Sequence, residues 1–345
     1  MTTLPRVLSG DRPTGPLHLG HLVGSLTQRV RLQRDHEVFI LIADLHVLTT
    51  RQQPNELDQI EKNVRGLLLD YLSVGIDPQR CTIGLQSAIP EICELAVLLS
   101  NLTPAARLQR LPSLKEMARH AAIEGMSMGL LGYPVLQAAD ILSARAGLIP
   151  VGRDNLPHIE LARELARRFN RLYGETFPEP KPIVMGETLV GIDNLGKMSK
   201  SAGNAIFLRD DPAVVRKKVR RMYTDPNRIH ADIPGTVEGN PIFLFHDRFN
   251  PDGTMVESLK ARYRAGTVGD GEVKARLLEA LEATLAPIRA RRLQIEARPG
   301  LIERTLIEGT ERMRQQAQQT LRSVRRAMRL DQTLIRARRR LNRIG

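Results

Sequence analysis

The sequence is poor in cysteine and has no long uninterrupted hydrophobic run, and both scarcities narrow what it can encode. Cys81 and Cys93 are its only cysteines, and neither has a cysteine or histidine neighbour at the spacing of a metal site. We therefore expect reduced, buried thiols and no protein-bound metal. The apolar stretch at residues 129–142 contains Gln137 and Asp140, which argues against a membrane span. The first five residues are too short and polar for a signal peptide, so we expect a cytoplasmic protein.

Acidic residues are also scarce near the C-terminus, where most of the excess positive charge lies. The 345 residues carry a formal net charge of +13, and residues 286–345 contain 16 arginines and no lysine against five acidic residues. Arginines on helices suit contacts with phosphate, so this segment favours binding to nucleic acid. The alternative is a solvated helix surface that only keeps the protein in solution. At 42% hydrophobic and 26% charged residues, the chain is typical of a soluble protein with room for two domains.

A glycine-rich segment near the N-terminus is a candidate functional site. Residues 9–21 read Ser-Gly-Asp-Arg-Pro-Thr-Gly-Pro-Leu-His-Leu-Gly-His, between a short apolar run and a helical pattern. Glycines let the backbone approach a ligand closely, and the free N–H groups of a helix N-terminus attract phosphate. His18 and His21 stand three residues apart in the first turn of that helix. The segment predicts a nucleotide site, although a glycine-rich turn alone is a weak signal.

A second motif lies far downstream. Residues 196–203 read Gly-Lys-Met-Ser-Lys-Ser-Ala-Gly, which places Lys197 and Lys200 on a loop bounded by glycines, where they can close over a triphosphate. The early His-Leu-Gly-His and this Lys-Met-Ser-Lys-Ser, in this order, resemble the paired signatures of the class I aminoacyl-tRNA synthetases. Taken alone, the histidines of the first motif could simply cap a helix, and the lysines of the second could lie on an exposed basic turn. Together the two motifs predict an ATP site.

Strands and helices alternate through the first half of the chain. Apolar runs predict strands at 6–8, 37–43, 81–85, 148–151 and 183–185, and helical patterns lie between them at 22–33, 54–74 and 158–169. This alternation is typical of an α/β fold with a Rossmann-like, doubly wound parallel sheet. A largely helical insertion is expected over about 91–131. Beyond residue 210 the chain reads as mostly helical.

We place a domain boundary near residue 205. The prediction is a catalytic α/β domain at 1–205, which includes the lysine loop, and a helical C-terminal domain at 206–345 that binds tRNA. The final arginine run, residues 336–340, is a candidate for a disordered basic tail.

The substrate pocket is predicted around residues 133–140. In a helix, Tyr133, Gln137 and Asp140 stand at i, i+4 and i+7 on one face. A carboxylate among alanines is costly to bury without a hydrogen-bond donor. That donor could be an indole N–H, a phenol O–H or an arginine of the protein itself.

The resemblance becomes more specific when other segments are added. Over about residues 5–330 the chain resembles the tryptophanyl-tRNA synthetases, on the two signatures and on residues 44–46, 125–129, 133–140, 151–154, 222–226 and 237–241. Tyrosyl-tRNA synthetases are close relatives that also use a carboxylate at this place. Their lysine loop usually reads Lys-Phe-Gly-Lys-Ser, so Met198 and Ser199 favour tryptophan.

The resemblance implies a role for each matching position. Asp140 would accept the indole N–H, His46 would lie near the amino or carboxyl end of L-tryptophan, and the remaining pocket residues would be Leu8, Tyr133, Gln137 and Asn155. His18, His21, Lys197 and Lys200 would act on the phosphates of Mg²⁺-bound ATP. The other ATP contacts would be Arg12, Pro13, Thr14, Gly20, Gly152, Arg153, Asp154, Leu189, Met198, Ser199 and Ser201. The implied partner is tRNA(Trp), and the implied assembly is a homodimer.

Four positions depart from the commonest family pattern. Arg12 replaces a frequent Gln, Gln137 a Met, Arg153 an acidic residue, and Asn155 a Gln expected near the substrate ammonium. Asn155 is also a candidate helix N-cap. These departures resemble an auxiliary, antibiotic-tolerant branch of the family. Two alternatives stay open: a relative that activates tyrosine, and a catalytically weak paralogue that binds RNA or another partner.

Overall fold

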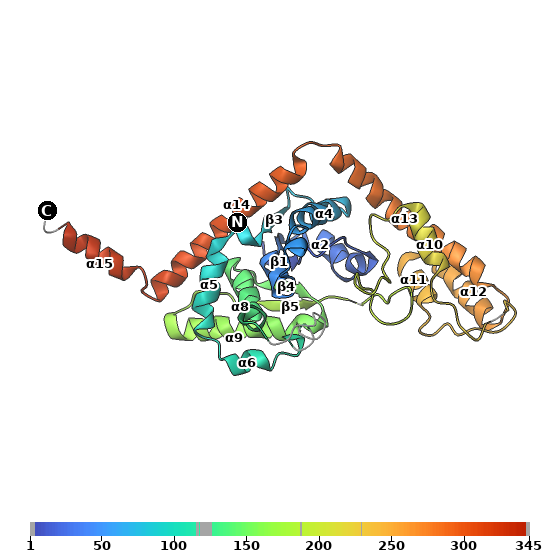
Figure 1. The fold of residues 1–345 in the computed structure, drawn as a ribbon, viewed down its shortest axis with the longest axis horizontal. Helices are drawn as coiled ribbons and strands as arrows, with labels where there is room; N and C mark the ends of the chain where they lie inside the picture. The colour runs from blue at the N-terminus through green and yellow to red at the C-terminus, as the bar shows by residue number, and fades with distance from the viewer. Residues whose placement is uncertain (1–3, 115–116, 118–125, 187, 229, 343–345) are drawn as a thin grey trace.

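The computed structural model describes residues 4–114, 117, 126–186, 188–228 and 230–342. The centre of this part of the chain is a parallel sheet of five strands in the order β3-β2-β1-β4-β5 (Figure 1). The strands are β1 Arg6–Asp11, β2 Glu37–Ile42, β3 Cys81–Leu85, β4 Leu148–Val151 and β5 Lys181–Val184. The chain starts at the centre, builds outward to one edge and then crosses to build the other, which confirms the predicted doubly wound sheet.

Helices connect the strands and form most of the second half. Those of the first half are α1 Leu19–His21, α2 Thr27–Leu32, α3 Pro54–Leu57, α4 Ile60–Ser73, α5 Pro90–Ser100, α6 Ala105–Gln109, α8 Met128–Ser143 and α9 Leu156–Tyr173. Those of the second half are α10 Pro212–Arg220, α11 Pro241–Phe249, α12 Gly253–Arg264, α13 Asp270–Glu296, α14 Leu301–Ala327 and α15 Gln332–Leu341. Short helical turns follow three strands, at Leu45–Thr49, Gln86–Ala88 and Arg153–Asn155, and a π-helical turn, Leu22–Leu26, joins α1 to α2.

The two faces of the sheet carry separate apolar cores, because successive side chains of a strand point to opposite faces. Val7 and Ile40 belong to a buried cluster that includes residues of α4 and α13. Their neighbours Leu8 and Leu41 belong to a second cluster, built with α5, α8 and α9. The alternation explains why continuous apolar runs are needed in strands covered on both faces.

Helix α14 covers the edge of the sheet at β3 and is in close contact with it (Figure 1). A side-chain carbon added at Gly309 would lie 2.0 Å from the carbonyl oxygen of Ile83, so only glycine allows this approach. The N–H of Leu85 donates to the Thr310 hydroxyl at 3.0 Å. The helix therefore replaces a neighbouring strand along this edge.

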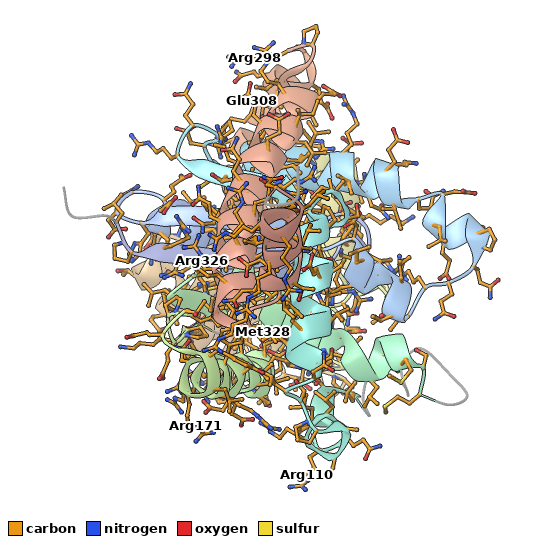
Figure 2. The ribbon with its side chains drawn as sticks, turned by 90° about the vertical axis from the view of Figure 1, so that its left-hand side faces the viewer. Arg110, Arg171, Arg298, Glu308, Arg326 and Met328 are labelled. Carbon is orange, nitrogen blue, oxygen red and sulfur yellow. The ribbon has the colours of Figure 1, made fainter. Side chains whose placement is uncertain are left out.

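The arginines of α14 are partly paired with α5, whereas α15 is exposed. Figure 2 faces α14, with Arg326 and Met328 near its end. Arg314 pairs with Glu91 at 3.1 Å, and Arg325 pairs with Glu94 at 2.6 Å. Helix α15 has no buried residue.

Several boundaries differ from those expected. Strand β1 runs on to Asp11, because Gly10 lets β1 continue beside β2: an added side-chain carbon there would lie 2.6 Å from the Leu41 carbonyl oxygen. Strand β5 begins and ends earlier than 183–185, since its first residue pairs with Leu148 of β4. The single helix expected at 54–74 is divided into α3 and α4.

Two further expectations concern the insertion and the tail. Of the insertion expected at about 91–131, α5, α6 and the start of α8 are helical, and residues 115–116 and 118–125 lie outside the described residues. The arginine run at 336–340, a candidate for a disordered tail, is helical and lies within α15. Among the described helices, none combines the length and the apolar character that a membrane crossing requires.

Candidate functional site

The carboxyl ends of four neighbouring strands bring most of the predicted site residues to one edge of the sheet. Strand β1 leads into the glycine-rich loop, and β2 leads into Asp44 and His46. Strand β3 is followed by Gln86, and β4 by Gly152. In open parallel sheets, ligands bind at this edge, where loops from adjacent strands meet.

The two histidines of the first motif cap the helix that they begin. The N–H of Gly20 donates to Nδ1 of His18 at 3.1 Å, and the N–H of His18 donates to Nδ1 of His21 at 3.2 Å. Because each Nδ1 accepts, each neutral ring carries its proton on Nε2, where it can donate to a ligand. The histidines can therefore cap the helix through Nδ1 and still donate to a phosphate through Nε2.

Both rings are neutral at physiological pH. Burial lowers the pKa of His18 to about 3, and the nearby His21, Lys200 and Lys197 act in the same direction. Burial also lowers the pKa of His21 to about 4, against the opposing charge of Asp11. The ring centroids lie 3.8 Å apart, so the pair forms one compact donor group.

The lysine loop lies against the glycine-rich loop. Nζ of Lys200 donates to the carbonyl oxygen of Gly15 at 2.8 Å and lies 3.4 Å from the Thr14 hydroxyl. Burial lowers the pKa of Lys200 to about 8. Met198 is buried and packs near Gly20, whereas Lys197 is exposed. The structure thus brings Lys200, but not Lys197, into hydrogen-bond contact with the first motif.

Backbone N–H groups of the lysine loop donate to residues on either side of the loop. The N–H of Met198 donates to the carbonyl oxygen of Leu189 at 2.9 Å, and the side chain of Leu189 is buried. The N–H of Ser199 donates to Oδ1 of Asn204 at 2.8 Å, and the hydroxyls of Ser199 and Ser201 lie 2.9 Å apart. The loop therefore has a defined conformation.

Arg12 crosses from the glycine-rich loop toward the turn after β2. Its Nη2 donates to the Thr50 hydroxyl at 2.6 Å, and its Nε is buried with no hydrogen-bond partner among the described residues. Burial, with the charge of Arg51, lowers the pKa of Arg12. The neighbouring Pro13 is buried, and the N–H of Thr14 donates to the carbonyl oxygen of Arg12 at 2.8 Å.

Asp140 is the buried carboxylate of the site, and its partners are now defined. His46 Nε2 lies 3.0 Å from Oδ2, and Nε2 of Gln86 lies 2.8 Å from Oδ1 and 3.0 Å from Oδ2. Burial raises the pKa of Asp140, and the hydrogen bonds from His46 and Gln86 oppose that rise. No arginine pairs with Asp140 among the described residues, which removes that alternative for its donor.

Tyr133 lies beside this carboxylate, but its hydroxyl is engaged elsewhere. The hydroxyl is 3.1 Å from the Ser113 hydroxyl and 3.2 Å from Nε2 of His158. Its ring meets the ring of His46 edge to face, with centroids 6.1 Å apart. Burial lowers the pKa of His158 to about 4, so this histidine is neutral. Tyr133 therefore offers its ring, rather than its hydroxyl, to a ligand beside His46.

The remaining predicted residues lie around this centre with less defined contacts. Leu8 is buried in β1, and Gln137 is half-buried on α8. After β4, Arg153 and Asp154 are exposed, and the Asp154 carboxylate lies close to Gly152. Asn155 stands at the N-cap position of α9, but in the described structure its side chain makes no capping hydrogen bond.

Sequence reasoning missed a charged cluster behind the glycine-rich loop. Nη1 of the buried Arg29 lies 2.5 Å from Oδ2 of Asp11, and the Tyr71 hydroxyl donates to the same oxygen at 2.7 Å. Burial alone would raise the pKa of Asp11, but the charge of Arg29 holds it below its usual range. The only sequence signal was an aspartate within the glycine-rich segment, three residues after the strand predicted at 6–8.

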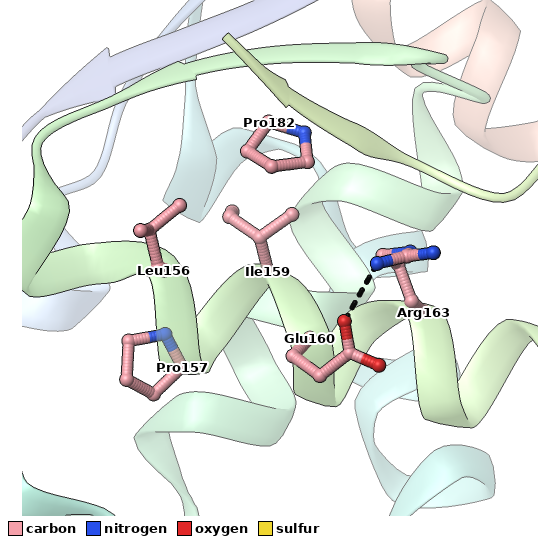
Figure 3. Close-up of a pocket in the computed structure, with 6 residues that line it drawn as sticks. All are labelled: Leu156, Pro157, Ile159, Glu160, Arg163 and Pro182. Carbon is pink, nitrogen blue, oxygen red and sulfur yellow. Dashed lines mark hydrogen bonds and ion pairs between the residues drawn. The ribbon is translucent and has the colours of Figure 1, made fainter. Parts of the chain in front are cut away.

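The described surface has a cavity away from the predicted site residues and another beside the glycine-rich loop. One, of about 300 Å³, lies between α9 and β5 and contains none of the predicted site residues (Figure 3); it is lined by Leu156, Pro157, Ile159, Glu160, Arg163 and Pro182. The other, of about 170 Å³, adjoins the glycine-rich loop and is lined by Gly15, Pro16, Gln59, Lys62, Asn63, Gly66, Asp70 and Arg209. Within the described residues, no group of three or more His, Cys, Asp or Glu side chains has the arrangement of a metal site.

The sequence matches known proteins over most of its length. The family model for class I tRNA synthetases (W and Y) matches residues 2–286. The tryptophan–tRNA ligase of Treponema pallidum is 59% identical over 324 residues, which is 94% of this chain and 96% of the relative. That of Chlamydia caviae is 54% identical over 336 residues, 96% of this chain and 97% of the relative.

A solved structure gives the same result at the level of the fold. The tryptophanyl-tRNA synthetase of Campylobacter jejuni, in complex with ADP and tryptophan, is similar with a TM-score of 0.82 and 33% identity. The match covers 94% of this chain and 99% of that one.

Proposed function

The chain belongs to the class I tRNA synthetases for tryptophan and tyrosine, and we propose that it is a tryptophan–tRNA ligase. The observation that carries the proposal is the buried Asp140, held by His46 and Gln86 at the carboxyl edge of the sheet. The full-length relatives that are 46–59% identical are tryptophan–tRNA ligases, which favours tryptophan over tyrosine.

In the proposed pocket, Asp140 accepts the indole N–H of L-tryptophan. The ring of Tyr133 and the side chains of Leu8 and Gln137 line the indole site. Asn155 lies toward the substrate ammonium, whereas His46 holds the Asp140 carboxylate at the indole end. The carboxylate at 140 gives specificity because it offers an acceptor that only a substrate with a ring donor can use.

In the first proposed step, the tryptophan carboxylate attacks the α-phosphorus of ATP, which enters as its Mg²⁺ complex. The α-phosphorus to bridging-oxygen bond breaks, giving tryptophanyl-adenylate and pyrophosphate. No nucleophile of the protein is needed, since the reaction requires positioning and stabilisation of phosphate charge. The Nε2–H groups of His18 and His21 donate near the α-phosphate, and Lys197 and Lys200 close over the β- and γ-phosphates.

The proposed adenosine and phosphate contacts come from three loops. Arg12, Pro13, Thr14 and Gly20 belong to the glycine-rich loop. Gly152, Arg153 and Asp154 lie at the adenosine side, and Leu189 packs on adenine. Met198, Ser199 and Ser201 complete the lysine loop.

In the second step, the terminal ribose hydroxyl of tRNA(Trp) attacks the adenylate carbonyl and releases AMP. We assign tRNA binding to residues 206–345 and adenylate formation to residues 1–205. The exposed arginines of α15 support this assignment, because they offer charge to phosphate without reading sequence. We further propose a cytoplasmic homodimer.

A catalytically weak paralogue would not need the motif residues. The neutral, capped pair His18 and His21 and the contact of Lys200 with Gly15 favour an active enzyme instead.

The first experiment is tryptophan-dependent ATP–pyrophosphate exchange, with tyrosine and phenylalanine measured alongside. The chain contains no tryptophan, so binding of the substrate can also be followed by indole fluorescence. Exchange with tryptophan alone supports the proposal, and charging of tRNA(Trp) is then the second assay. Exchange with tyrosine would identify tyrosine as the substrate. No exchange by folded protein would favour a catalytically weak paralogue.

A further inference from the structure

The residue before His18 is held on both sides of its backbone. The N–H of Leu17 donates to Oδ2 of Asp70, on α4, at 2.9 Å. Its carbonyl oxygen accepts from the N–H of Leu208, just after the lysine loop, at 3.0 Å. The backbone at Leu17 therefore sets where His18 lies relative to both α4 and the lysine loop.

Asp70 is buried and depends on a partner from the second half of the chain. Only 2% of its surface is exposed, and its Oδ1 accepts from Nη1 of Arg292, on α13, at 2.6 Å. Burial raises the pKa of Asp70, and the Leu17 N–H and the Arg292 charge oppose that rise. A buried carboxylate without such a partner is strongly unfavourable. Arg292 is thus the arginine that pairs directly with Asp70, while the charges of Arg209 and Lys200 also favour the ionised carboxylate.

The space around Asp70 allows its carboxylate a second side-chain conformation. Asp70 lines the cavity of about 170 Å³ beside Gly15 and Pro16. A carboxylate without its arginine can rotate into this cavity and be hydrated there. The hydrogen bond to Leu17 would then break, although α4 and the loop had not moved apart.

A neighbouring arginine joins the same two helices without touching Asp70. Nε of Arg291 donates to the carbonyl oxygen of Ser73, at the end of α4, at 2.6 Å. Arg291 therefore attaches α13 to α4, and Arg292 does so through the buried carboxylate. Substituting each residue in turn therefore distinguishes the packing of α13 on α4 from the positioning of Asp70.

We propose that Asp70 is a positioning residue through which Arg292 of α13 holds the loop of Leu17 and His18 in its ATP-binding position. The helical second half of the chain thereby completes the ATP site. The proposal rests on the function proposed above. It adds a residue outside both motifs and a dependence of adenylate formation on α13.

The first test compares Arg292→Met with Arg291→Met in tryptophan-dependent ATP–pyrophosphate exchange by the full chain. Arg292→Met should lower kcat about tenfold or more, because a displaced loop misplaces the histidine donors. The KM for tryptophan should change little, and Arg291→Met should stay within about twofold of the wild type. Equal losses in both variants, or no loss in Arg292→Met, would overturn the proposal.

A double variant tests whether Arg292 acts through Asp70. Asp70→Asn should itself lower kcat, and adding Arg292→Met to it should cause no further loss, since the two residues act in series. Additive losses would show that Arg292 acts by another route and would contradict the proposal.

A third measurement needs no catalytic activity. Amide hydrogen exchange over residues 15–20 should be faster in Arg292→Met than in the wild type and unchanged in Arg291→Met. An inactive wild type with this difference would refute the proposed function and leave the linkage standing. An active wild type without this difference would refute the linkage.

Discussion

The side-chain amide of Gln86 connects the turn after β2 to helix α8 and fixes the carboxylate of Asp140. Its Nε2 donates to both oxygens of Asp140, at 2.8 and 3.0 Å, while its Oε1 accepts from the N–H of Leu45 at 3.1 Å. Gln86 is fully buried. One amide therefore ties the turn after β2, which carries His46, to the carboxylate on α8.

Replacing Gln86 should weaken tryptophan activation. Gln86→Met keeps the length of the side chain but removes the hydrogen bonds, and a bond to a charged group contributes about 1.5–3 kcal/mol. We expect kcat/KM for tryptophan to fall by roughly tenfold to a hundredfold. Gln79→Met, on the exposed turn before β3, is the control and should have no effect.

The same variant should change the pH dependence. Without the Gln86 donors, the pKa of Asp140 rises further, so the carboxylate is ionised only at higher pH. The acid limb of kcat/KM for tryptophan should therefore move to higher pH than in the wild type. A lower kcat/KM with an unmoved acid limb would mean that Gln86 only packs the site.

Removing the carboxylate itself should abolish the preference for tryptophan. Asp140→Ala leaves the indole N–H without an acceptor, while His46 and Gln86 can still bond to water. We expect the ratio of tryptophan to tyrosine activation to collapse with the fold retained, as measured by competitive exchange and circular dichroism. An unchanged ratio would refute the assignment of Asp140.

Lys200 should act as a cation with an unusually low pKa. Since burial lowers its pKa to about 8, its charge is lost as the pH rises from 7 to 9. We expect kcat/KM for ATP to decline with a midpoint near pH 8. Lys200→Arg should remove this decline because a guanidinium stays charged. A decline that persists in the arginine variant must come from another group.

The two lysines of the loop should contribute more to kcat than to the binding of ATP in the ground state. Lys197→Ala and Lys200→Ala should lower kcat more than they raise the KM for ATP, because closure over the phosphates strengthens in the transition state. A rise in KM with unchanged kcat would mean that the loop only binds ATP.

Helix α15 should contribute charge to RNA binding. Deletion of residues 332–345 should weaken tRNA binding and reduce the slope of log K against log salt, by roughly 0.7–0.9 for each phosphate that the protein no longer neutralises. Leu334→Gln, on the same exposed helix, keeps every arginine and should leave the slope unchanged. An unchanged slope after the deletion would mean that α15 is a solvated surface.

Patterns of short range could be predicted from the sequence. Strands β2, β3 and β4 follow from apolar runs, and both motifs lie on loops that the structure brings together through Lys200 and Gly15. Asp140 could be singled out because a carboxylate among alanines is unusual. These features depend on neighbours in the sequence, so a periodic pattern reveals them.

Partners that are distant in sequence could not be predicted in the same way. Gln86 lies 54 residues before Asp140, and Arg292 lies 222 residues after Asp70. Neither has a local signal, because an isolated polar residue at the end of a strand or on a helix is equally suited to solvent. Only the packing of the helices on the sheet removes the solvent and makes each contact necessary.

The close fit of α14 on β3 has a consequence for how this protein can be divided. Gly309 and Thr310 occupy the free side of the outermost strand, where unpaired backbone groups would otherwise recruit a strand from another molecule. A fragment that ends before α14 would expose that side. Residues 1–205 made alone should therefore aggregate, because the helix that shields this edge of the sheet from self-association belongs to the second half of the chain.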